Sequence, residues 1–291
     1  MSESRTEPLA YSVVIPAYSE AKGLPSVLKP LLEAAQGAEI IVVDDGSTDG
    51  TAEVARAIGG QRVRVLQHAE NRGYGAALKT GIRAASHDVI VIVDADGTYP
   101  VDRIGELVER AREADMVVGA RVGLKRAIPL YRRPTKWLLR HVTNYLVRGK
   151  VPDPNSGLRV IHRRALERFM NLLPEGFSFT TTLTLAMHVN GCRVEYVPVA
   201  YRPRLGRSKI RPLRDTGNFI KLILRTTLYF DPLRVFGPLS AVLFAASLAV
   251  LIYGVVSHHI LDGTITVLFT AGLQMLSIGL VADLINRKMG R

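Results

Sequence analysis

From Tyr11 to about Ala200, short apolar runs alternate with stretches in which apolar residues recur at helical spacing. Continuous runs such as Ile40–Val43 and Val89–Val93 are typical of strands buried on both faces of a parallel sheet. Strands are predicted over Tyr11–Ile15, Glu39–Val43, Arg62–Gln67, Val89–Val93, Met116–Gly119, Leu158–His162 and Arg193–Val197. Helices are predicted between them, for example over Gly23–Ala35, Thr51–Ala57, Gly75–Ala85 and Val101–Ala114. This alternation predicts an α/β domain with a mostly parallel sheet, whose ligands bind beyond the carboxyl ends of the strands.

Two long apolar runs near the end of the chain predict transmembrane helices over about 235–256 and 264–283. Each run is close to the roughly 20 residues that a helix needs to cross about 30 Å of hydrocarbon. The alternative is a pair of helices buried in a soluble core, but such helices rarely run this far without a charge. The pattern therefore predicts a C-terminal transmembrane helical hairpin.

Positive charge is unevenly distributed around this hairpin. The loop 257–263 has no Lys or Arg, whereas the outer flanks carry Arg225, Arg234, Arg287, Lys288 and Arg291. By the positive-inside rule, both flanks lie in the cytoplasm and the short loop lies outside. The polar N-terminal residues Met1–Ala10 do not form a signal peptide pattern. We therefore expect a protein of the cell membrane with two spans, with its first domain and both termini in the cytoplasm.

These patterns predict three parts: a cytoplasmic α/β domain over 1–200, a basic segment over 201–231 and the two membrane helices within 232–291. The basic segment interleaves apolar residues with cations, as do helices that lie in the lipid headgroup region. Its cations are Arg202, Arg204, Arg207, Lys209, Arg211, Arg214, Lys221 and Arg225. The alternative for this segment is an ordinary linker with solvated charges.

The overall charge indicates a polyanionic partner. The 291 residues carry a formal net charge of +12, with a pI near 10.0. Because the basic segment adjoins the predicted membrane helices, an anionic lipid is favoured and no nucleic-acid partner is expected. The single cysteine, Cys192, excludes an intrachain disulfide, and the seven His residues are not spaced with it as zinc ligands.

Two acidic clusters each follow a predicted buried strand. Asp44 and Asp45 begin Asp-Asp-Gly-Ser-Thr-Asp-Gly, and Asp94 and Asp96 belong to Asp-Ala-Asp-Gly-Thr-Tyr-Pro. In an extended chain, Asp94 and Asp96 point to the same side. Such a pair suits Mg²⁺ or Mn²⁺, which bridges diphosphate oxygens and offsets the charge of a nucleoside-diphosphate leaving group. The alternative for residues 47–49 is turn and helix-cap chemistry.

Three residues after the first predicted strand are candidates for nucleoside binding. Pro16 is expected to end that strand. Tyr18 can stack on a base, and Glu20 can accept a hydrogen bond from a base or a ribose. The alternative is a rigid turn in which the Glu20 carboxylate is favoured by a helix dipole.

Four motifs occur in a characteristic order and spacing. They are Val13–Glu20 (Val-Val-Ile-Pro-Ala-Tyr-Ser-Glu), Val42–Gly50, Asn71–Ala77 and Asp94–Gly97. Together they resemble family 2 of the inverting glycosyltransferases, and in particular the dolichyl-phosphate mannose or glucose synthases and their bacterial polyprenyl-phosphate relatives. The resemblance covers roughly residues 11 to 210. It implies the GT-A fold, a Rossmann-like nucleotide-sugar-binding fold, with a bound divalent metal.

The resemblance also implies a donor site. The implied nucleotide-sugar-binding residues are Pro16, Tyr18, Glu20, Val43, Asp44, Asp45, Asp94, Ala95 and Asp96. Asp96 is implied as the direct metal ligand, with Asp94 beside it. Many relatives carry Gln two residues after the second Asp, where it helps to bind metal, and here that position is Thr98. This departure leaves the metal shell and the donor open, and a UDP-sugar is expected ahead of GDP-mannose.

Later motifs imply an acceptor site. Gly119–Arg121 resembles the family's Gly-x-Arg, Asn155–Arg159 resembles its Ser-Gly-Phe/Leu-Arg element, and 204–209 matches a mobile Arg-x-Gly-x-Ser-Lys loop. The implied acceptor-phosphate residues are Arg121, Ser156, Arg159, Arg204, Arg207, Ser208 and Lys209. Arg gives forked contacts to phosphate and Lys gives a point charge. Arg204 and Lys209 are expected to act in catalysis together with Asp94 and Asp96.

The expected reaction is metal-dependent, inverting transfer of a hexose from a nucleotide-sugar to a polyprenyl or dolichyl phosphate. A phosphate monoester has a second pKa of about 6, so the acceptor is largely dianionic at neutral pH and needs no general base. Association of the two spans with those of a second copy is left open.

Three other classes are less favoured. A processive polysaccharide synthase would carry Gln-x-x-Arg-Trp, whereas the only tryptophan, Trp137, follows Arg-Pro-Thr-Lys. A nucleotidyltransferase would carry a glycine-rich loop after the first strand, which is missing here. A non-catalytic lipid-binding protein with a decayed site is disfavoured by the intact Asp45, Asp94, Asp96, Arg204 and Lys209.

Overall fold

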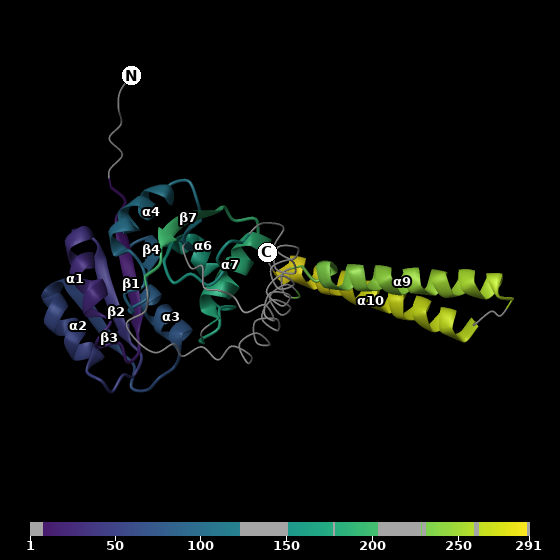
Figure 1. Cartoon of the computed structure of the whole chain (residues 1–291), viewed down its shortest axis with the longest axis horizontal. Helices are drawn as coiled ribbons and strands as arrows, with labels where there is room; N and C mark the ends of the chain where they lie inside the picture. The colour runs from purple at the N-terminus through teal and green to yellow at the C-terminus, as the bar shows by residue number, and fades with distance from the viewer. Residues whose placement is uncertain are drawn as a thin grey trace, which may run out of the picture. The chain divides into compact units, whose positions relative to one another are not determined.

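The computed structural model describes residues 8–122, 151–176, 178–202, 228, 231–258 and 262–289. These residues fall into two compact units, one within 1–216 and the other within 217–291 (Figure 1). The first unit contains a seven-stranded sheet flanked by helices, and the second contains two long helices.

The sheet of the first unit has the order β3-β2-β1-β4-β6-β5-β7. Its strands are β1 (Tyr11–Ala17), β2 (Glu39–Asp44), β3 (Val63–Gln67), β4 (Val89–Ile92), β5 (Met116–Val122), β6 (Arg159–His162) and β7 (Val194–Ala200). Only β6 runs antiparallel to its neighbours β4 and β5. The predicted α/β domain with a mostly parallel sheet is therefore confirmed, and every predicted strand is present with slightly shifted ends.

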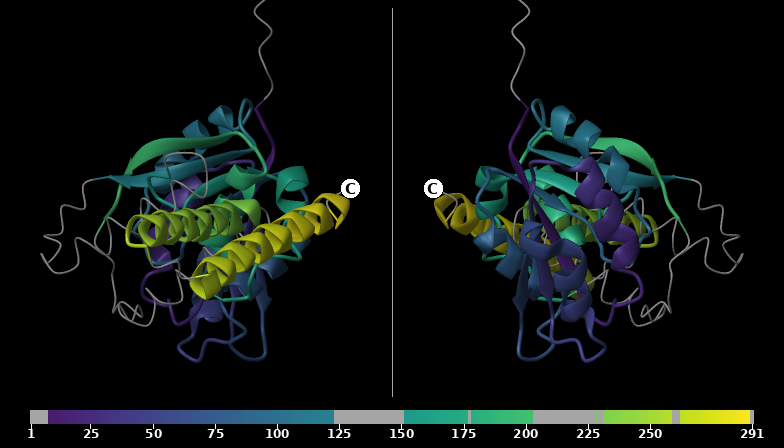
Figure 2. Two further views of the ribbon diagram at one scale, coloured as in Figure 1. Left: turned by 90° about the vertical axis from the view of Figure 1, so that its right-hand side faces the viewer. Right: turned by 90° about the vertical axis from the view of Figure 1, so that its left-hand side faces the viewer.

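Helices cover both faces of this sheet, and Figure 2 shows them from two sides. The helices are α1 (Pro25–Ala34), α2 (Thr51–Gly59), α3 (Tyr74–Ala84), α4 (Ile104–Arg110), α6 (Arg163–Glu167) and α7 (Phe179–Val189), with 3₁₀ turns η1 (Gly60–Arg62) and η2 (Val101–Arg103). Side chains of α1 and α4 share one apolar core with alternate residues of the central strands. On the opposite face, α3 packs closely on β1 and β2, because Gly81 lies against Val14 and Val43. The helix predicted over Val101–Ala114 is divided into η2 and a shorter α4.

Pro16 does not end the first strand, contrary to the sequence-based expectation. β1 continues to Ala17, and Pro16 stands opposite Val43 of β2 in the parallel register. On the other side, pairing of β1 with β4 stops at Val14. On that side, the Val14 carbonyl accepts a hydrogen bond from the Val93 N–H. The backbone groups of Val14 and Pro16 point to the same side of β1, because successive residues of a strand alternate. The missing N–H of Pro16 therefore falls where no ladder partner is required.

The second unit is a helical hairpin of α9 (Leu233–Val256) and α10 (Asp262–Met289). The Ser240 hydroxyl donates to the Gly272 carbonyl of the facing helix at 2.8 Å, and the Ser247 hydroxyl donates to the Ile265 carbonyl at 3.1 Å. The most apolar stretches have mean hydropathies of 2.4 and 1.9, and only 17% and 11% of these stretches is buried. Helices in a soluble core are mostly buried, so this hairpin has the exposed apolar surface of membrane-spanning helices.

Candidate functional site

The loops after β1, β2 and β4 lie at one edge of the sheet, because these adjacent strands are parallel. Ala17 at the end of β1 stands opposite Asp44 at the end of β2. The β1 and β4 loops also approach closely near Gly23. A Cβ added to Gly23 would lie 3.0 Å from the Ala95 carbonyl oxygen and 3.3 Å from the Asp96 Cα. The structure therefore brings two of the predicted motifs together at the carboxyl edge.

The β2 loop holds the β1 loop in place through side-chain oxygens. Three consecutive backbone N–H groups of the β1 loop donate to it: Ser19 to Ser47 Oγ at 2.9 Å, Glu20 to Thr51 Oγ1 at 3.0 Å and Ala21 to Asp49 Oδ2 at 3.1 Å. These bonds show that Ser47 and Asp49 of the β2 loop, together with Thr51 at the start of α2, hold the β1 loop in position. Tyr18 is 40% exposed at this edge, so its ring is accessible for stacking.

Asp44 and Asp45 are buried and bonded within the chain. Asp45 Oδ1 accepts from the Arg72 amide at 3.0 Å, and its Oδ2 accepts from the Gly73 amide at 2.8 Å. Asp44 accepts from the amide and hydroxyl of Ser47 and, at 3.2 Å, from the Gln67 side chain. Both carboxylates thus shape the loops around the candidate nucleoside site.

His68 is a site residue that the sequence reasoning missed. Its Nδ1 lies 2.6 Å from Asp45 Oδ1, and its Nε2 lies 2.9 Å from Thr80 Oγ1. The side chain is only 6% exposed, so it connects Asp45 to α3 inside the protein. The only available signal was that His68 directly follows β3. Val43, which was assigned to the nucleoside pocket, is fully buried and points toward Gly81 of α3.

Asp94 and Asp96 each accept a hydrogen bond from a nearby hydroxyl. Asp96 Oδ1 accepts from the Thr98 amide at 3.1 Å and from the Thr98 hydroxyl at 2.7 Å. Asp94 Oδ1 accepts from the Tyr74 hydroxyl at 2.8 Å. Thr98 is fully buried, so its observed role is to orient Asp96. Neither Tyr74 nor Gly157, which lies directly against the Asp94 carboxylate, was assigned a role from the sequence.

This carboxylate pair fits a divalent cation that shares its ligands with a substrate. Within the described ranges, no group of three or more His, Cys, Asp or Glu side chains could hold a metal ion. Mg²⁺ is commonly held by one or two carboxylates, with substrate phosphates and water completing the shell. Asp94 and Asp96 provide such hard oxygen ligands at the edge where parallel sheets bind substrates.

Replacing Tyr74 with Phe is expected to weaken nucleotide and metal binding without unfolding the protein. Burial and the neighbouring Asp94 charge raise the pKa of Tyr74 well above its usual value, so the hydroxyl stays protonated as a donor. A hydrogen bond to a charged group is worth about 1.5–3 kcal/mol, which corresponds to roughly 10- to 100-fold in affinity. Calorimetric titration of nucleotide with Mn²⁺ measures this loss. Tyr196→Phe is the matched control, because the Tyr196 hydroxyl bonds His188 instead; an equal loss in both variants would contradict a specific role of Tyr74.

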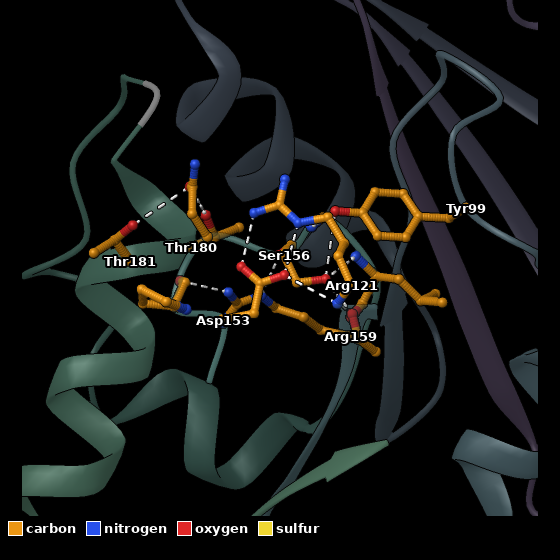
Figure 3. Close-up of polar contacts among 12 residues, drawn as sticks. Tyr99, Arg121, Asp153, Ser156, Arg159, Thr180 and Thr181 are labelled. Atoms are coloured by element: carbon orange, nitrogen blue, oxygen red, sulfur yellow. Dashed lines mark hydrogen bonds and ion pairs between the residues drawn. The ribbon is translucent and has the colours of Figure 1, made fainter. Parts of the chain in front are cut away.

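Arg121, from the predicted acceptor set, forms a forked ion pair with Asp153. Its Nε and Nη2 each lie 2.7 Å from a carboxylate oxygen of Asp153 (Figure 3). Burial alone raises the pKa of Asp153, but the hydrogen bonds and charge of Arg121 outweigh it and hold the pKa below its usual value. The guanidinium also lies over the Tyr201 ring, 5.4 Å from its centre. Arg121 remains 26% exposed, so it can still meet an anion at this edge.

Ser156 and Arg159 do not fit the expected contact with an acceptor phosphate, because both are fully buried. The Ser156 hydroxyl donates to the Gly119 carbonyl at 2.6 Å. The Arg159 guanidinium donates to the Ser156 carbonyl at 2.7 Å, the Pro154 carbonyl at 2.8 Å and the Thr184 hydroxyl at 2.6 Å (Figure 3). These bonds turn the segment before β6 inward and fix its path. Both side chains therefore position the 154–157 segment.

The predicted loop residues Arg204, Arg207, Ser208 and Lys209 lie outside the described residues.

Comparison with known proteins gives matches to both units. Residues 12–170 match glycosyl transferase family 2, and residues 231–287 match the GtrB C-terminal hairpin. The dolichyl-phosphate hexose transferase of Haloferax volcanii is 29% identical, over 78% of this chain and 97% of its own length. The undecaprenyl-phosphate 4-deoxy-4-formamido-L-arabinose transferase of Pseudomonas aeruginosa is 30% identical, over 95% of this chain and 85% of its own.

A solved structure has a similar fold. Glucosyl-3-phosphoglycerate synthase from Mycobacterium tuberculosis, in complex with Mn²⁺, uridine diphosphate and glucosyl-3-phosphoglycerate, superposes with a TM-score of 0.58 at 26% identity. The match covers 76% of this chain and 79% of that protein.

Proposed function

This chain belongs to glycosyl transferase family 2, and on that basis we propose that it transfers a sugar from a nucleotide-sugar to a polyprenyl phosphate. It is a glycosyltransferase with the GT-A fold and a C-terminal helical hairpin. The observation that carries the proposal is the joint match of both units, since relatives named for transfer to lipid phosphates align with this chain. The hairpin would anchor the enzyme where such a lipid acceptor is embedded.

The proposed donor site lies at the carboxyl edge of β1, β2 and β4. Tyr18 would stack on the base, and Glu20 would accept a hydrogen bond from the nucleoside. Asp44 and Asp45 would act indirectly, by holding the loops against which the nucleoside lies. The β4 segment from Asp94 to Asp96 would hold the diphosphate.

A divalent cation fits this donor site, with Asp96 and Asp94 as its protein ligands. When bound, Mg²⁺ or Mn²⁺ would neutralise charge on the departing nucleoside diphosphate. Thr98 would keep Asp96 oriented through its two hydrogen bonds, and Tyr74 would do the same for Asp94. A structural relative crystallised with Mn²⁺ and uridine diphosphate supports this assignment.

The proposed acceptor site uses cations to bind the lipid phosphate. Arg121 would contact the phosphate from β5, and the loop residues Arg204, Arg207, Ser208 and Lys209 would close over it. The phosphate has a second pKa of about 6, so it can attack the anomeric carbon without transferring a proton to the enzyme. Catalysis would then rest on positioning and charge stabilisation. The sugar would be inverted, because attack comes from the side opposite the leaving diphosphate.

The donor is proposed to be a UDP-hexose, with GDP-mannose as the alternative. The two curated relatives are named for different sugars, so sequence similarity alone does not choose between donors. The site is proposed to face the cytoplasm, because the residues flanking the hairpin are basic.

Purified full-length protein is expected to form one glycolipid from a polyprenyl phosphate, Mn²⁺ or Mg²⁺ and one member of a panel of UDP- and GDP-sugars. Mass spectrometry of the lipid product identifies the sugar. Asp96→Asn is expected to lower the rate by about 100-fold or more, since it removes a charged group from the reaction centre. Release of free sugar without glycolipid would contradict the proposed acceptor. No turnover of any donor, by protein that binds nucleotide, would contradict the proposed function.

A further inference from the structure

The buried imidazole of His68 lies between the end of β2 and helix α3. The His68 amide donates to the Asp44 carbonyl at 2.9 Å, which places the ring beside the β2 loop. Its Nδ1 lies 2.6 Å from Asp45 Oδ1, and its Nε2 lies 2.9 Å from Thr80 Oγ1. A carboxylate oxygen only accepts hydrogen bonds, so the proton of the first contact belongs to Nδ1. The Thr80 hydroxyl can donate or accept, so it fixes the plane of the ring in either protonation state.

The Asp45 carboxylate depends on protein donors, because Asp45 is only 2% exposed and water has little access to it. Among the described residues, its donors are the His68 ring and the backbone amides of Arg72 and Gly73. His68 is the only one of these donors that is a side chain. Without it, Asp45 would be a buried carboxylate with an incomplete set of hydrogen bonds, and it would be free to turn.

The two amides that Asp45 accepts from belong to the start of α3. Gly73 is the N-cap of this helix and has no side chain with which to cap it, so Asp45 supplies the cap from the β2 loop. On its other side, Gly73 is confined by the chain, because an added Cβ would lie 2.7 Å from the Glu175 carbonyl oxygen. Tyr74 is the next residue, and its hydroxyl donates to Asp94 Oδ1 at 2.8 Å. The orientation of Asp45 therefore determines where Tyr74 starts on its path to Asp94.

We propose that His68 is a positioning residue for the metal-binding end of the donor site. The Nδ1 N–H of His68 holds Asp45, Asp45 holds the first amides of α3, and Tyr74 at the start of α3 holds Asp94. This inference rests on the proposed function, in which Asp94 is a ligand of the divalent cation. The His68 side chain is only 6% exposed, so it acts through these groups and not by contact with a substrate.

Replacing His68 with Gln or Leu is expected to raise the Mn²⁺ concentration for half-maximal nucleotide binding by about 10-fold, the effect of losing one hydrogen bond to a charged group. His68→Asn is expected to stay close to the unaltered protein. The amide nitrogen of Asn takes the place of Nδ1 and can donate to Asp45, whereas that of Gln takes the place of Nε2 beside Thr80. Calorimetric titration of the full-length protein with UDP and with GDP, over a series of Mn²⁺ concentrations, measures the change.

The melting temperature is measured on the same samples, because all three substitutions remove a ring from a buried place. If His68 had only a structural role, the Asn and Gln variants would lose nucleotide affinity in step with their melting temperatures. Such a result, with no rescue by Asn, would overturn the inference. His188→Leu is the matched control, because His188 bonds the Tyr196 hydroxyl and no donor-site residue, and it is expected to keep the Mn²⁺ requirement of the unaltered protein.

A double-mutant cycle tests the path through Tyr74. His68→Gln is expected to add little to the effect of Tyr74→Phe, because the hydroxyl that His68 helps to position is then already missing. Fully additive effects would show that His68 acts by another path and would overturn the inference. An unaltered protein whose UDP and GDP binding does not respond to Mn²⁺ would contradict the proposed donor site and the inference with it. A responsive unaltered protein with an unaffected His68→Gln variant would overturn the inference alone.

Discussion

Replacing Gly157 with Ala is expected to lower kcat/KM by about 100-fold or more while the protein stays folded. An added Cβ would lie 1.9 Å from Oδ2, 2.3 Å from Cγ and 2.6 Å from Oδ1 of Asp94. Real Cβ contacts do not approach this closely, so the carboxylate must move by about 1 Å or more. Misplacement of a reacting group by about 1 Å can cost 100-fold in rate. Asp94 is partly exposed, so its side chain can turn toward solvent without disrupting the core.

Steady-state kinetics with the identified donor, together with Mn²⁺-dependent nucleotide affinity and melting temperature, check this expectation. Gly105→Ala is the matched control, because a Cβ on Gly105 would meet nothing within 4 Å. We expect that control to keep its activity. Wild-type kcat/KM and nucleotide affinity in Gly157→Ala would show that the reaction does not depend on the observed position of the Asp94 carboxylate.

Replacing Arg159 with Met is expected to destabilise the first unit by about 3 kcal/mol. The change leaves the buried Ser156 carbonyl without its guanidinium donor and removes the donor to the Thr184 hydroxyl. The Pro154 carbonyl also loses its guanidinium donor and keeps only the Thr184 hydroxyl, at 3.2 Å. Each buried unsatisfied group costs about 1–3 kcal/mol. Relief of the buried charge offsets part of this cost, because no carboxylate in the described part of the chain forms an ion pair with Arg159.

Thermal unfolding in detergent measures this loss, which corresponds to a decrease in Tm of roughly 6–12 °C for a unit of this size. Arg164→Met is the control, because its side chain is 85% exposed, and its Tm is expected to stay within about 2 °C of the unaltered protein. If Arg159 instead bound the acceptor phosphate, the variant would keep its Tm and raise KM for the lipid. That result would reverse the assignment of Arg159 as a positioning residue.

The strands were predictable because burial on both faces leaves a continuous apolar run that is visible in a short window. The expectation for Pro16 was wrong because a strand can contain proline where no neighbouring strand needs its N–H. Here β1 pairs with β2 as far as Ala17 but with β4 only as far as Val14, and the sequence does not show this difference. The spacing of apolar residues also could not show that the predicted Val101–Ala114 helix is divided into a 3₁₀ turn and a shorter α-helix.

The acidic pair of the candidate site was predictable from local spacing, whereas its supporting groups were not. Tyr74 and Gly157 lie 20 and 63 positions from Asp94 in the sequence, and only the sheet brings them together. Arg159 appeared to be a phosphate ligand because motif similarity does not encode the direction of a side chain. Its inward course depends on α7, which supplies Thr184.

The reversal of β6 has a consequence for how such an enzyme can diversify. Because β5 ends and β6 begins at the same edge of the sheet, Arg121 near the end of β5 and the 154–157 segment before β6 both lie at the edge of the proposed donor loops. On the proposed site assignment, the acceptor-binding residues begin at Arg121 in the sequence, and the nucleotide-binding loops come before Pro100. The two substrates would then be recognised by separate parts of the sequence, so substitutions could change the preferred lipid without disturbing recognition of the activated sugar.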